Sequence, residues 1–232
     1  NYRRALAIDP GLAATHHNLG RLLAVARRLS EAEAAYRQAL MLKPDLAEAA
    51  NTLGTVLLAL RRPEEALDLF RRAQRLRPGS ADFANNLGRA LQAVGRIDEA
   101  ETAFRNATVW APDHALAWSN LAVTIRGPGR NDEALAAHLR AVELLASSDP
   151  IGGEVRANLA LALLARGRRD EAEAEYRRAL ALRPDNPELH GDFLACLQYR
   201  DDITPKQLAR EHISWDDRHA APLRSAWPTH DR

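Results

Sequence analysis

The sequence predicts an all-α fold made of stacked helix pairs, and three observations lead to that prediction. Prolines recur at a spacing of 34 residues, small and apolar residues recur at fixed places between them, and turn-forming residues interrupt each copy. The prolines are Pro10, Pro44, Pro78 and Pro112, followed after one longer step by Pro150 and Pro184. A fixed period of this length is typical of repeat arrays, in which neighbouring copies bury one continuous core.

The composition limits what the chain can be. It has 232 residues, 46% of them apolar, so a sizeable core can form. A net charge of +1 gives no general attraction to nucleic acid or to a membrane surface, and we expect neither as a partner. The single cysteine, Cys196, indicates a reducing compartment, and we expect a cytoplasmic protein. Because Asn1 falls within the repeat pattern, we expect the chain to be part of a longer protein.

The 34-residue grid sets the predicted domain boundaries. A repeat array should occupy residues 1–199, beginning with a half repeat at 1–12 and ending with a partial repeat at 187–199. The five full repeats between them are 13–46, 47–80, 81–114, 115–152 and 153–186. Residues 200–232 do not follow the 34-residue repeat, and we interpret them as a separate connector segment.

Each full repeat should begin with a first helix, because positions 4, 7, 8 and 11 of the repeat share one helical face. Position 7 is always Leu, and position 8 is Gly in three repeats and Ala in two, as in Gly88 and Ala160. A small residue at position 8 lets a second helix approach closely. Gly95, Gly129 and Gly167 fall where the first helix should end, because glycine readily adopts the left-handed conformation there.

A second helix should follow, with positions 20, 24 and 27 on its packed face. Positions 20 and 27 are Ala in every full repeat, and position 24 is aromatic except for His138. We expect N-caps at Ser30, Asp98 and Asp170, each with Glu three residues later.

Charged residues recur at the start of each predicted second helix. Position 16 is always Arg and position 19 is always Glu, so we expect the Arg to pair with that Glu or with the next repeat's loop. The Glu also complements the helix dipole.

One stretch departs from the pattern. Residues 125–153 contain Pro128 between two glycines, His138 in the aromatic place and a four-residue insertion. Two interpretations stay open, a tolerated variation of a loop and a bend or hinge in the array.

A polar column at position 6 is the candidate binding feature. Its members are Asn18, Thr52, Asn86, Asn120, Asn158 and Asp192. This position faces away from the packed stripe, and a carboxamide can pair with both the N–H and the C=O of a peptide backbone. At ~8–10 Å between helices and ~3.3 Å per extended residue, one position-6 side chain would serve about three residues of bound peptide. The alternative is that the column only ties adjacent helices together.

Other polar residues on the same helices extend this candidate surface. They are Asn51 and Asn85 at position 5, and Arg21 and Arg89 at position 9.

The connector segment should contain a helix of its own. Thr204, Pro205 and Gln207 form a capping-box pattern, and the helix should run to about Ala220. A stripe of mixed aromatic and apolar character lies along it, formed by Leu208, His212, Trp215 and His219. We expect this stripe to dock against a following domain.

The repeat pattern of residues 1–199 resembles the tetratricopeptide repeat, although the large aromatic residue at position 4 of that family is present only as Trp118. The resemblance implies an α-solenoid, a right-handed superhelix of helix-turn-helix repeats whose concave groove carries position 6. It implies that the groove holds a partner protein or an extended peptide. Proteins of this family sometimes dimerise through their convex faces, so a homodimer stays open.

The connector resembles that of O-linked N-acetylglucosamine transferases, including the SPINDLY-like group. The matching residues are Asp202, Ile203, Thr204, Pro205, Glu211, His212, Trp215, Arg218, His219, Ala220, Pro222 and Leu223. This resemblance implies a protein O-glycosyltransferase whose repeats hold the acceptor protein. Its catalytic domain would lie beyond Arg232 and would use a nucleotide sugar such as UDP-GlcNAc.

No catalytic or metal-binding set is apparent in the sequence itself. The eight histidines are scattered, and neither a nucleophile elbow nor a phosphate-binding glycine loop is present. We therefore expect no cofactor in this chain. Two hypotheses remain, the substrate-binding region of a glycosyltransferase and a stand-alone adaptor without catalysis.

Overall fold

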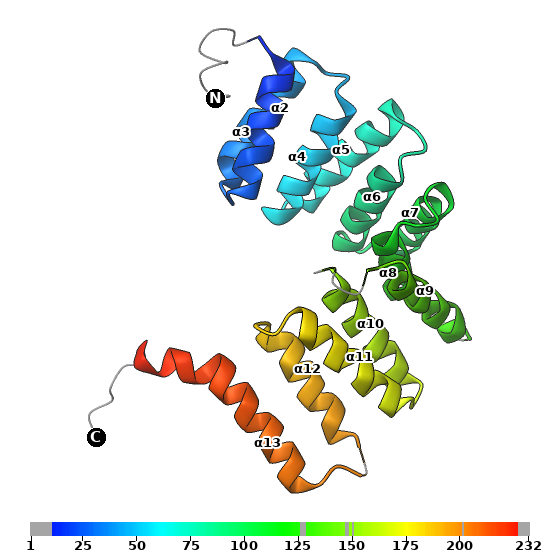
Figure 1. Cartoon of the computed structure of the whole chain (residues 1–232). Coiled ribbons are helices and arrows are strands. Elements are labelled where there is room, and N and C mark those ends of the chain that lie inside the picture. Colours follow the sequence, from blue (N-terminus) through cyan, green and yellow to red (C-terminus); the bar gives the residue numbers. More distant parts are fainter. Residues whose placement is uncertain (1–10, 126–128, 147–148, 150, 201, 227–232) are drawn as a thin grey trace. The chain divides into compact units, whose positions relative to one another are not determined.

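The computed structural model describes residues 11–125, 129–146, 149, 151–200 and 202–226. Every regular element in these ranges is a helix, which confirms the predicted all-α class (Figure 1). None of the described helices is both long and apolar enough to span a membrane. The chain divides into two compact units, Asn1–Thr124 and Ile125–Arg232, and each is described by itself.

The first unit is a series of helical hairpins. In chain order its helices are α2 (Ala13–Val25), α3 (Leu29–Leu42), α4 (Ala47–Ala59), α5 (Pro63–Leu76), α6 (Ala81–Ala93), α7 (Ile97–Trp110) and α8 (Ala115–Thr124). The first and second helices of a repeat pack together, as α4 does with α5, and each second helix also packs on the next first helix (Figure 1). The half repeat predicted at 1–12 lies almost entirely outside the described residues, which start at Gly11.

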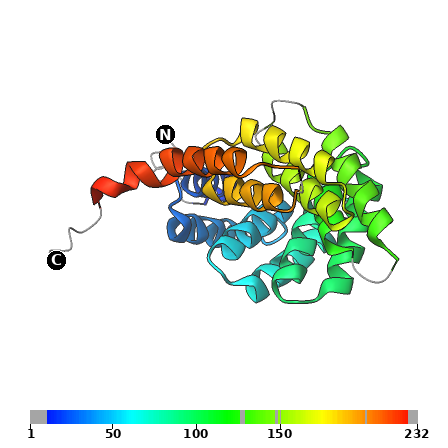
Figure 2. The same cartoon turned by 90° about the horizontal axis from the view of Figure 1, so that it is seen from below.

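The second unit continues with the same kind of hairpin. It contains α9 (Asn131–Glu143), α10 (Gly152–Ala165), α11 (Arg169–Leu182), α12 (Pro187–Gln198) and α13 (Pro205–Trp215), followed by a π-helical turn (Asp216–Ala220) and a 3-10 helix (Ala221–Ala226). Helix α13 lies alongside α12 (Figures 1 and 2). The predicted capping box at Thr204 and Gln207 is present. The α-helix ends at Trp215 rather than near Ala220, and the π-helical turn and the 3-10 helix continue the helical backbone to Ala226.

The core is built from the small and aromatic positions of each repeat. Ala residues at positions 20 and 27 are part of this core, and Ala66 and Ala73 are examples that are fully buried. The ring at position 24 lies directly over the glycine at position 8. A Cβ atom added to Gly88 would lie 2.6 Å from Cε1 of Phe104. The close approach inferred from the sequence is therefore present.

The turn between the two helices of a repeat uses a left-handed residue at position 15. Gly95, Gly129 and Gly167 have φ values of 78°, 78° and 71°, as predicted. Arg27 and Arg61 hold the same place in the first two full repeats, with φ values of 59° and 61°. The left-handed backbone conformation at position 15 is thus the same in these five repeats, although it is less favourable for Arg than for Gly.

The predicted N-caps are wrong. Ser30, Asp98 and Asp170 lie inside α3, α7 and α11, and the residue before each of these helices is the position-16 Arg. No side-chain cap is formed there. The helices begin earlier because the position-16 Arg bonds across the first turn to the position-19 Glu, so that a pair of charges stands where a capping side chain was expected.

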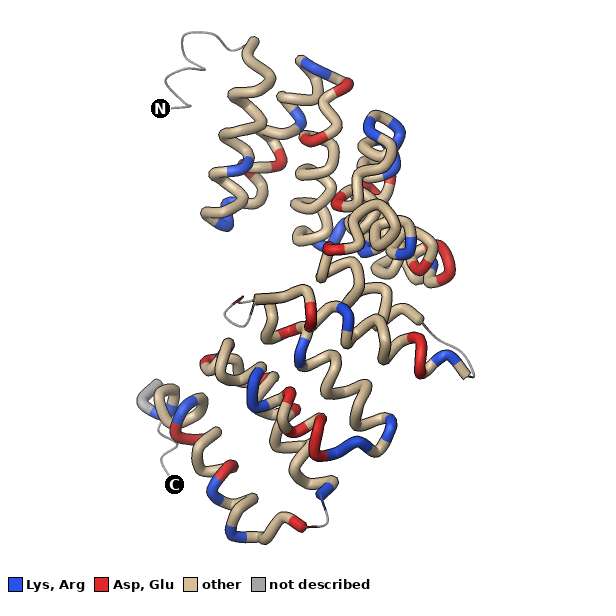
Figure 3. Tube along the Cα trace, turned by 45° about the vertical axis from the view of Figure 1, so that its right-hand side comes forward, with Lys and Arg blue, Asp and Glu red and all other residues tan. Residues whose placement is uncertain are grey.

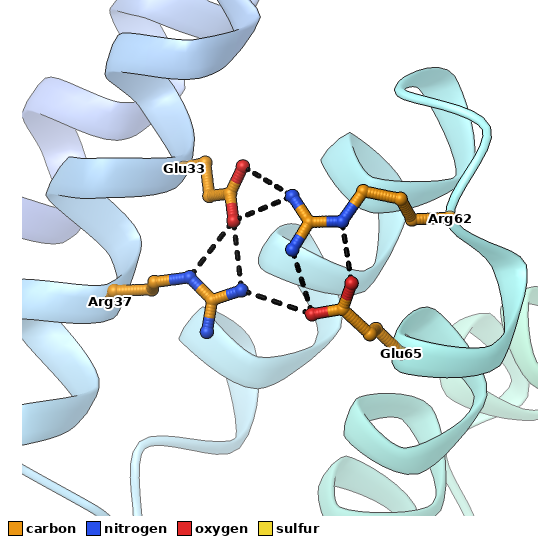
Figure 4. A network of polar contacts seen from close by, with 4 residues as sticks. All are labelled: Glu33, Arg37, Arg62 and Glu65. Atoms are coloured by element: carbon orange, nitrogen blue, oxygen red, sulfur yellow. Dashed lines mark hydrogen bonds and ion pairs between the residues drawn. The ribbon is translucent and has the colours of Figure 1, made fainter.

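The predicted Arg–Glu pairing is confirmed in every full repeat. The pairs are Arg28–Glu31, Arg62–Glu65, Arg96–Glu99, Arg130–Glu133 and Arg168–Glu171. Between the first two full repeats these charges extend into a network (Figure 4). Arg62 Nη1 lies 2.8 Å from Glu33 Oε2, and Arg37 Nη2 lies 3.2 Å from Glu65 Oε2. These contacts join α3 to α5 along the second-helix side of the first unit.

The irregular stretch 125–153 begins where the two compact units divide, after Thr124. Residues 126–128, 147–148 and 150 of this stretch lie outside the described residues. Whether it is a hinge stays a prediction. The predicted division between array and connector at residue 199 also stays a prediction.

Candidate functional site

The position-6 column occupies corresponding places on the first helices, and its residues behave differently in the two units. In the first unit Asn86 Nδ2 donates a hydrogen bond to Asn51 Oδ1 at 3.0 Å. Asn120 Nδ2 donates to Asn85 Oδ1 at 2.8 Å. Position 6 of one repeat thus bonds to position 5 of the preceding repeat. These bonds support the interpretation in which the column ties helices together.

The other first-unit members of the column lack this carboxamide pair. The hydroxyl of Thr52 donates to its own helix, at 2.8 Å from the carbonyl oxygen of Glu48. Asn18 is half-buried on α2 and forms no side-chain hydrogen bond to a described residue. The column is polar throughout the sequence, but its members differ in their hydrogen bonds.

Charged residues flank the carboxamides in the first unit. Arg21 and Arg89 are exposed, and neither forms an ion pair with another described residue. Two acidic residues of the first helices are already paired, Glu48 on α4 with Arg77 and Asp82 on α6 with His114 at 3.1 Å. The two unpaired guanidinium groups remain available to a partner.

In the second unit the two position-6 residues line one cavity. Asn158 on α10 and Asp192 on α12 face a cavity of about 160 Å³. Gly153, Glu154, Ala157, Arg183, Asn186, Glu188 and Leu189 complete its lining. Neither Asn158 nor Asp192 forms a side-chain hydrogen bond to a described residue. For Asp192, the position-5 residue of the preceding repeat is Ala157, which offers no carboxamide.

The ionised carboxyl group of Asp192 lies in an unfavourable electrostatic environment in this cavity. Partial burial, and then repulsion from Glu188, raises the pKa of its carboxyl group. Arg183 lines the same cavity without forming an ion pair to a described residue. Figure 3 shows residues of both signs interspersed along the second unit rather than gathered in blocks.

A buried hydroxyl group lies next to Asp192. Tyr176 on α11 is fully enclosed, and its hydroxyl has no hydrogen-bond partner among the described residues. Burial, followed by the charge of Asp192, raises the pKa of this phenol. At the equivalent place in the first full repeat, Tyr36 forms a side-chain hydrogen bond with Thr52 of the position-6 column. Position 24 of one repeat therefore lies beside position 6 of the next.

The stripe on the connector helix lies largely against this chain's own α12. Leu208 packs at the edge of the second unit's core. Trp215 Nε1 donates to the carbonyl oxygen of Pro187 at 3.2 Å, and His219 Nε2 lies 3.1 Å from His190 Nδ1. His212 is exposed. Docking of the stripe on a following domain stays a prediction, and three of its four residues already have contacts within the chain.

The described residues hold no group of three or more His, Cys, Asp or Glu side chains that could bind a metal ion. Cys196 is buried within the second unit's core, as expected for a packed thiol, and burial raises its pKa. What the first helices present is a set of hydrogen-bonding and charged side chains, which suits recognition of another chain.

Sequence reasoning missed Arg183, Asn186, Glu188 and Tyr176. A signal was present in the sequence: the position-5 residue one repeat before Asp192 is Ala157, whereas Asn51 and Asn85 hold this place before Asn86 and Asn120. That change leaves Asp192 without a carboxamide partner.

Comparison with known families gives consistent matches. Three models described as tetratricopeptide repeat match residues 17–81, 57–123 and 113–185, and together they span residues 17–185. Among curated protein sequences no relative matches the chain.

Solved structures of repeat proteins are similar in fold. YrrB, described as a TPR protein with an unusual peptide-binding site, is 23% identical, with a TM-score of 0.60 over 85% of this chain and 97% of its own. A thermophilic TPR protein of Thermus thermophilus is 24% identical, with a TM-score of 0.67 over 81% of this chain and 100% of its own. PilF of Pseudomonas aeruginosa is 18% identical, with a TM-score of 0.71 over 94% of this chain and 93% of its own.

These likenesses confirm the expected solenoid fold class. Neither the family matches nor these structures point to a glycosyltransferase. The 34-residue period, the paired helices and the three family matches show that the chain belongs to the tetratricopeptide-repeat family.

Proposed function

We propose that this chain binds an extended segment of a partner protein along its first helices. A tetratricopeptide-repeat scaffold is suited to binding proteins or peptides, and YrrB is described as having a peptide-binding site. The observation that carries the proposal is the hydrogen-bonding capacity left on positions 5, 6 and 9. Asn158 and Asp192 have no side-chain partner among the described residues, and Arg21 and Arg89 form no ion pair there.

The bonded carboxamides also retain capacity. Each of Asn86 and Asn120 uses one N–H in its bond to the preceding repeat. A carboxamide has two N–H donors and one oxygen acceptor, so one donor and the acceptor stay available to a peptide backbone. Tying the helices together and pairing with a peptide are therefore compatible roles for the same side chain.

A selected peptide tests this proposal. The probe is the tightest-binding member of a random 12-residue peptide library, labelled with a dye and followed by fluorescence anisotropy. Asn158→Ala and Arg89→Ala should each raise the Kd at least about threefold, as loss of one polar contact implies. Arg75→Ala, on the exposed side of α5, is the matched control and should leave the Kd unchanged. Equal affinity for all four proteins would overturn the proposal.

We also propose a more specific role, in which the bound segment is the acceptor of a protein O-glycosyltransferase. What supports it is the connector resemblance at residues 202–223, together with the Thr204 capping box. The nucleotide sugar would then belong to a catalytic domain encoded beyond Arg232. The test is transfer of radiolabelled sugar from UDP-GlcNAc to protein by the full native gene product. A native gene product that lacks a catalytic domain would favour the stand-alone adaptor.

Two further expectations belong to the same proposal. The chain works in the cytoplasm, on the basis of its cysteine usage, and the choice between monomer and homodimer stays open. Light scattering of the purified chain at several concentrations decides between the two masses.

A further inference from the structure

We propose that the cavity between Asn158 and Asp192 binds a basic side chain, Lys or Arg, of the partner peptide. This inference rests on the proposed peptide-binding function and specifies the chemistry of one position in the peptide. The site lies wholly within the second unit, and its lining comes from α10, from the segment that follows α11 and from α12.

The first step is the space that small residues leave. Gly153 and Ala157, the latter at position 5 of its repeat, are small residues of the cavity lining. The resulting cavity of about 160 Å³ is several times the ~30 Å³ that a water molecule occupies in the liquid. The end of a Lys or Arg side chain therefore has room to enter.

The second step is the charge inside the cavity. Glu154 and Glu188 lie in the first turns of α10 and α12, where the helix dipole offsets their charge. Asp192 lies beyond the first turn of α12 and has no such compensation. None of the three forms an ion pair with a described residue, and Arg183 is the lining residue of opposite charge. An added cation would relieve the repulsion between Asp192 and Glu188, which raises the pKa of Asp192.

The third step is the set of acceptors that line the cavity. They are the side-chain oxygen of Asn158 and the carboxylates of Glu154, Glu188 and Asp192. A Lys ammonium group has three N–H donors, and an Arg guanidinium group has five. The acceptors of the cavity therefore match a cation better than a neutral or acidic side chain.

A pair of defined peptides tests the inference. The probes are acetyl-Gly-Gly-Lys-Gly-Gly-amide and the same peptide with norleucine, which keeps the aliphatic chain but lacks the charge. Each is titrated into the ¹⁵N-labelled protein at low salt, and the side-chain amide signals of Asn158 and Asn186 are followed. The Lys peptide should shift these signals with a Kd about two- to fivefold lower than that of the norleucine peptide, the range for a solvent-accessible ion pair.

Variants assign the preference to this cavity. Asp192→Asn should abolish the difference between the two peptides. Asp217→Asn removes the same charge from an exposed residue outside the cavity and should preserve the difference. Arg183→Gln removes the competing cation and should tighten binding of the Lys peptide about twofold.

The outcomes separate the inference from the function on which it rests. Equal Kd values for the two probes, or a Lys preference that survives Asp192→Asn, would overturn the inference and leave peptide binding intact. If neither probe shifts the Asn158 signals and the library-selected peptide also fails to bind, both the inference and the proposed function fall.

Discussion

The two carboxamide pairs of the first unit lead to a graded prediction for stability. Replacing Asn120 with Ala removes its 2.8 Å hydrogen bond and leaves the oxygen of Asn85 without that donor. Asn85 is only 5% exposed, so water cannot readily replace the lost donor. A hydrogen bond contributes about 0.5–1.5 kcal/mol, and an unsatisfied buried group costs about 1–3 kcal/mol. We expect Asn120→Ala to lower the free energy of unfolding by about 2 kcal/mol.

The other two positions give the comparison. Asn86→Ala breaks a similar bond, but its partner Asn51 is half-buried and can turn to water, so we expect a loss of about 1 kcal/mol. Asn158 has no side-chain partner among the described residues, so Asn158→Ala should change stability by less than about 0.5 kcal/mol. The gain in helix propensity from Asn to Ala is common to all three variants and cancels in the comparison.

Urea unfolding followed by circular dichroism measures the series. The order of loss should be Asn120→Ala, then Asn86→Ala, then Asn158→Ala. In a double-mutant cycle, Asn85→Ala with Asn120→Ala should cost about 1 kcal/mol less than the sum of the single changes. Equal losses for Asn120→Ala and Asn158→Ala would refute the reasoning that the first-unit carboxamides support the fold.

Three further predictions concern the packing and charges of the scaffold. Gly88→Ala should destabilise the protein by about 1 kcal/mol, because the new Cβ atom would meet the Phe104 ring. Gly191→Ala should stabilise it by about 0.5–1 kcal/mol, because the new Cβ atom would meet no atom within 4 Å. The two variants should therefore shift the urea midpoint of unfolding in opposite directions. Burial lowers the pKa of His138 from 6.5 to about 4, so the unfolded chain takes up this proton first and stability falls as the pH drops from 6.5 towards 4. His138→Phe should remove about 3 kcal/mol of that loss, and parallel curves for the two proteins between pH 7.5 and 4 would contradict it. Arg62→Gln should lower the Tm by more at about 10 mM salt than at about 1 M salt, because salt screens the contacts of Arg62 with Glu33 and Glu65. Calorimetry at both salt concentrations measures this, and equal shifts of the Tm would refute it.

Much of the fold can be predicted from the sequence because it depends on local rules repeated in register. The Ala positions, the Gly–ring contacts and the left-handed turn at Gly95 each follow from residue size or backbone preference. The N-caps could not be predicted in this way. Ser30 and Asp98 have good capping chemistry, but the Arg–Glu pair across the first turn places the helix start earlier.

The polar column at position 6 could be predicted from the sequence, but the hydrogen bonds of its members could not. The partner of Asn86 lies 35 residues earlier, so the bond depends on how successive repeats pack. The same holds for the cavity at Asp192, because residues of two successive repeats line it. The contact between His219 and His190 was also not predictable, because it needs α13 to fold back along α12.

The most direct test of the account is to map where a bound peptide lies. We would add the library-selected peptide to ¹⁵N-labelled protein and record which amide signals shift. The account predicts shifts on the first helices, with the side-chain amide of Asn158 and the backbone around Asp192 among the largest. Shifts confined to the second helices α3, α5, α7, α9 and α11, with the first helices unchanged, would contradict it.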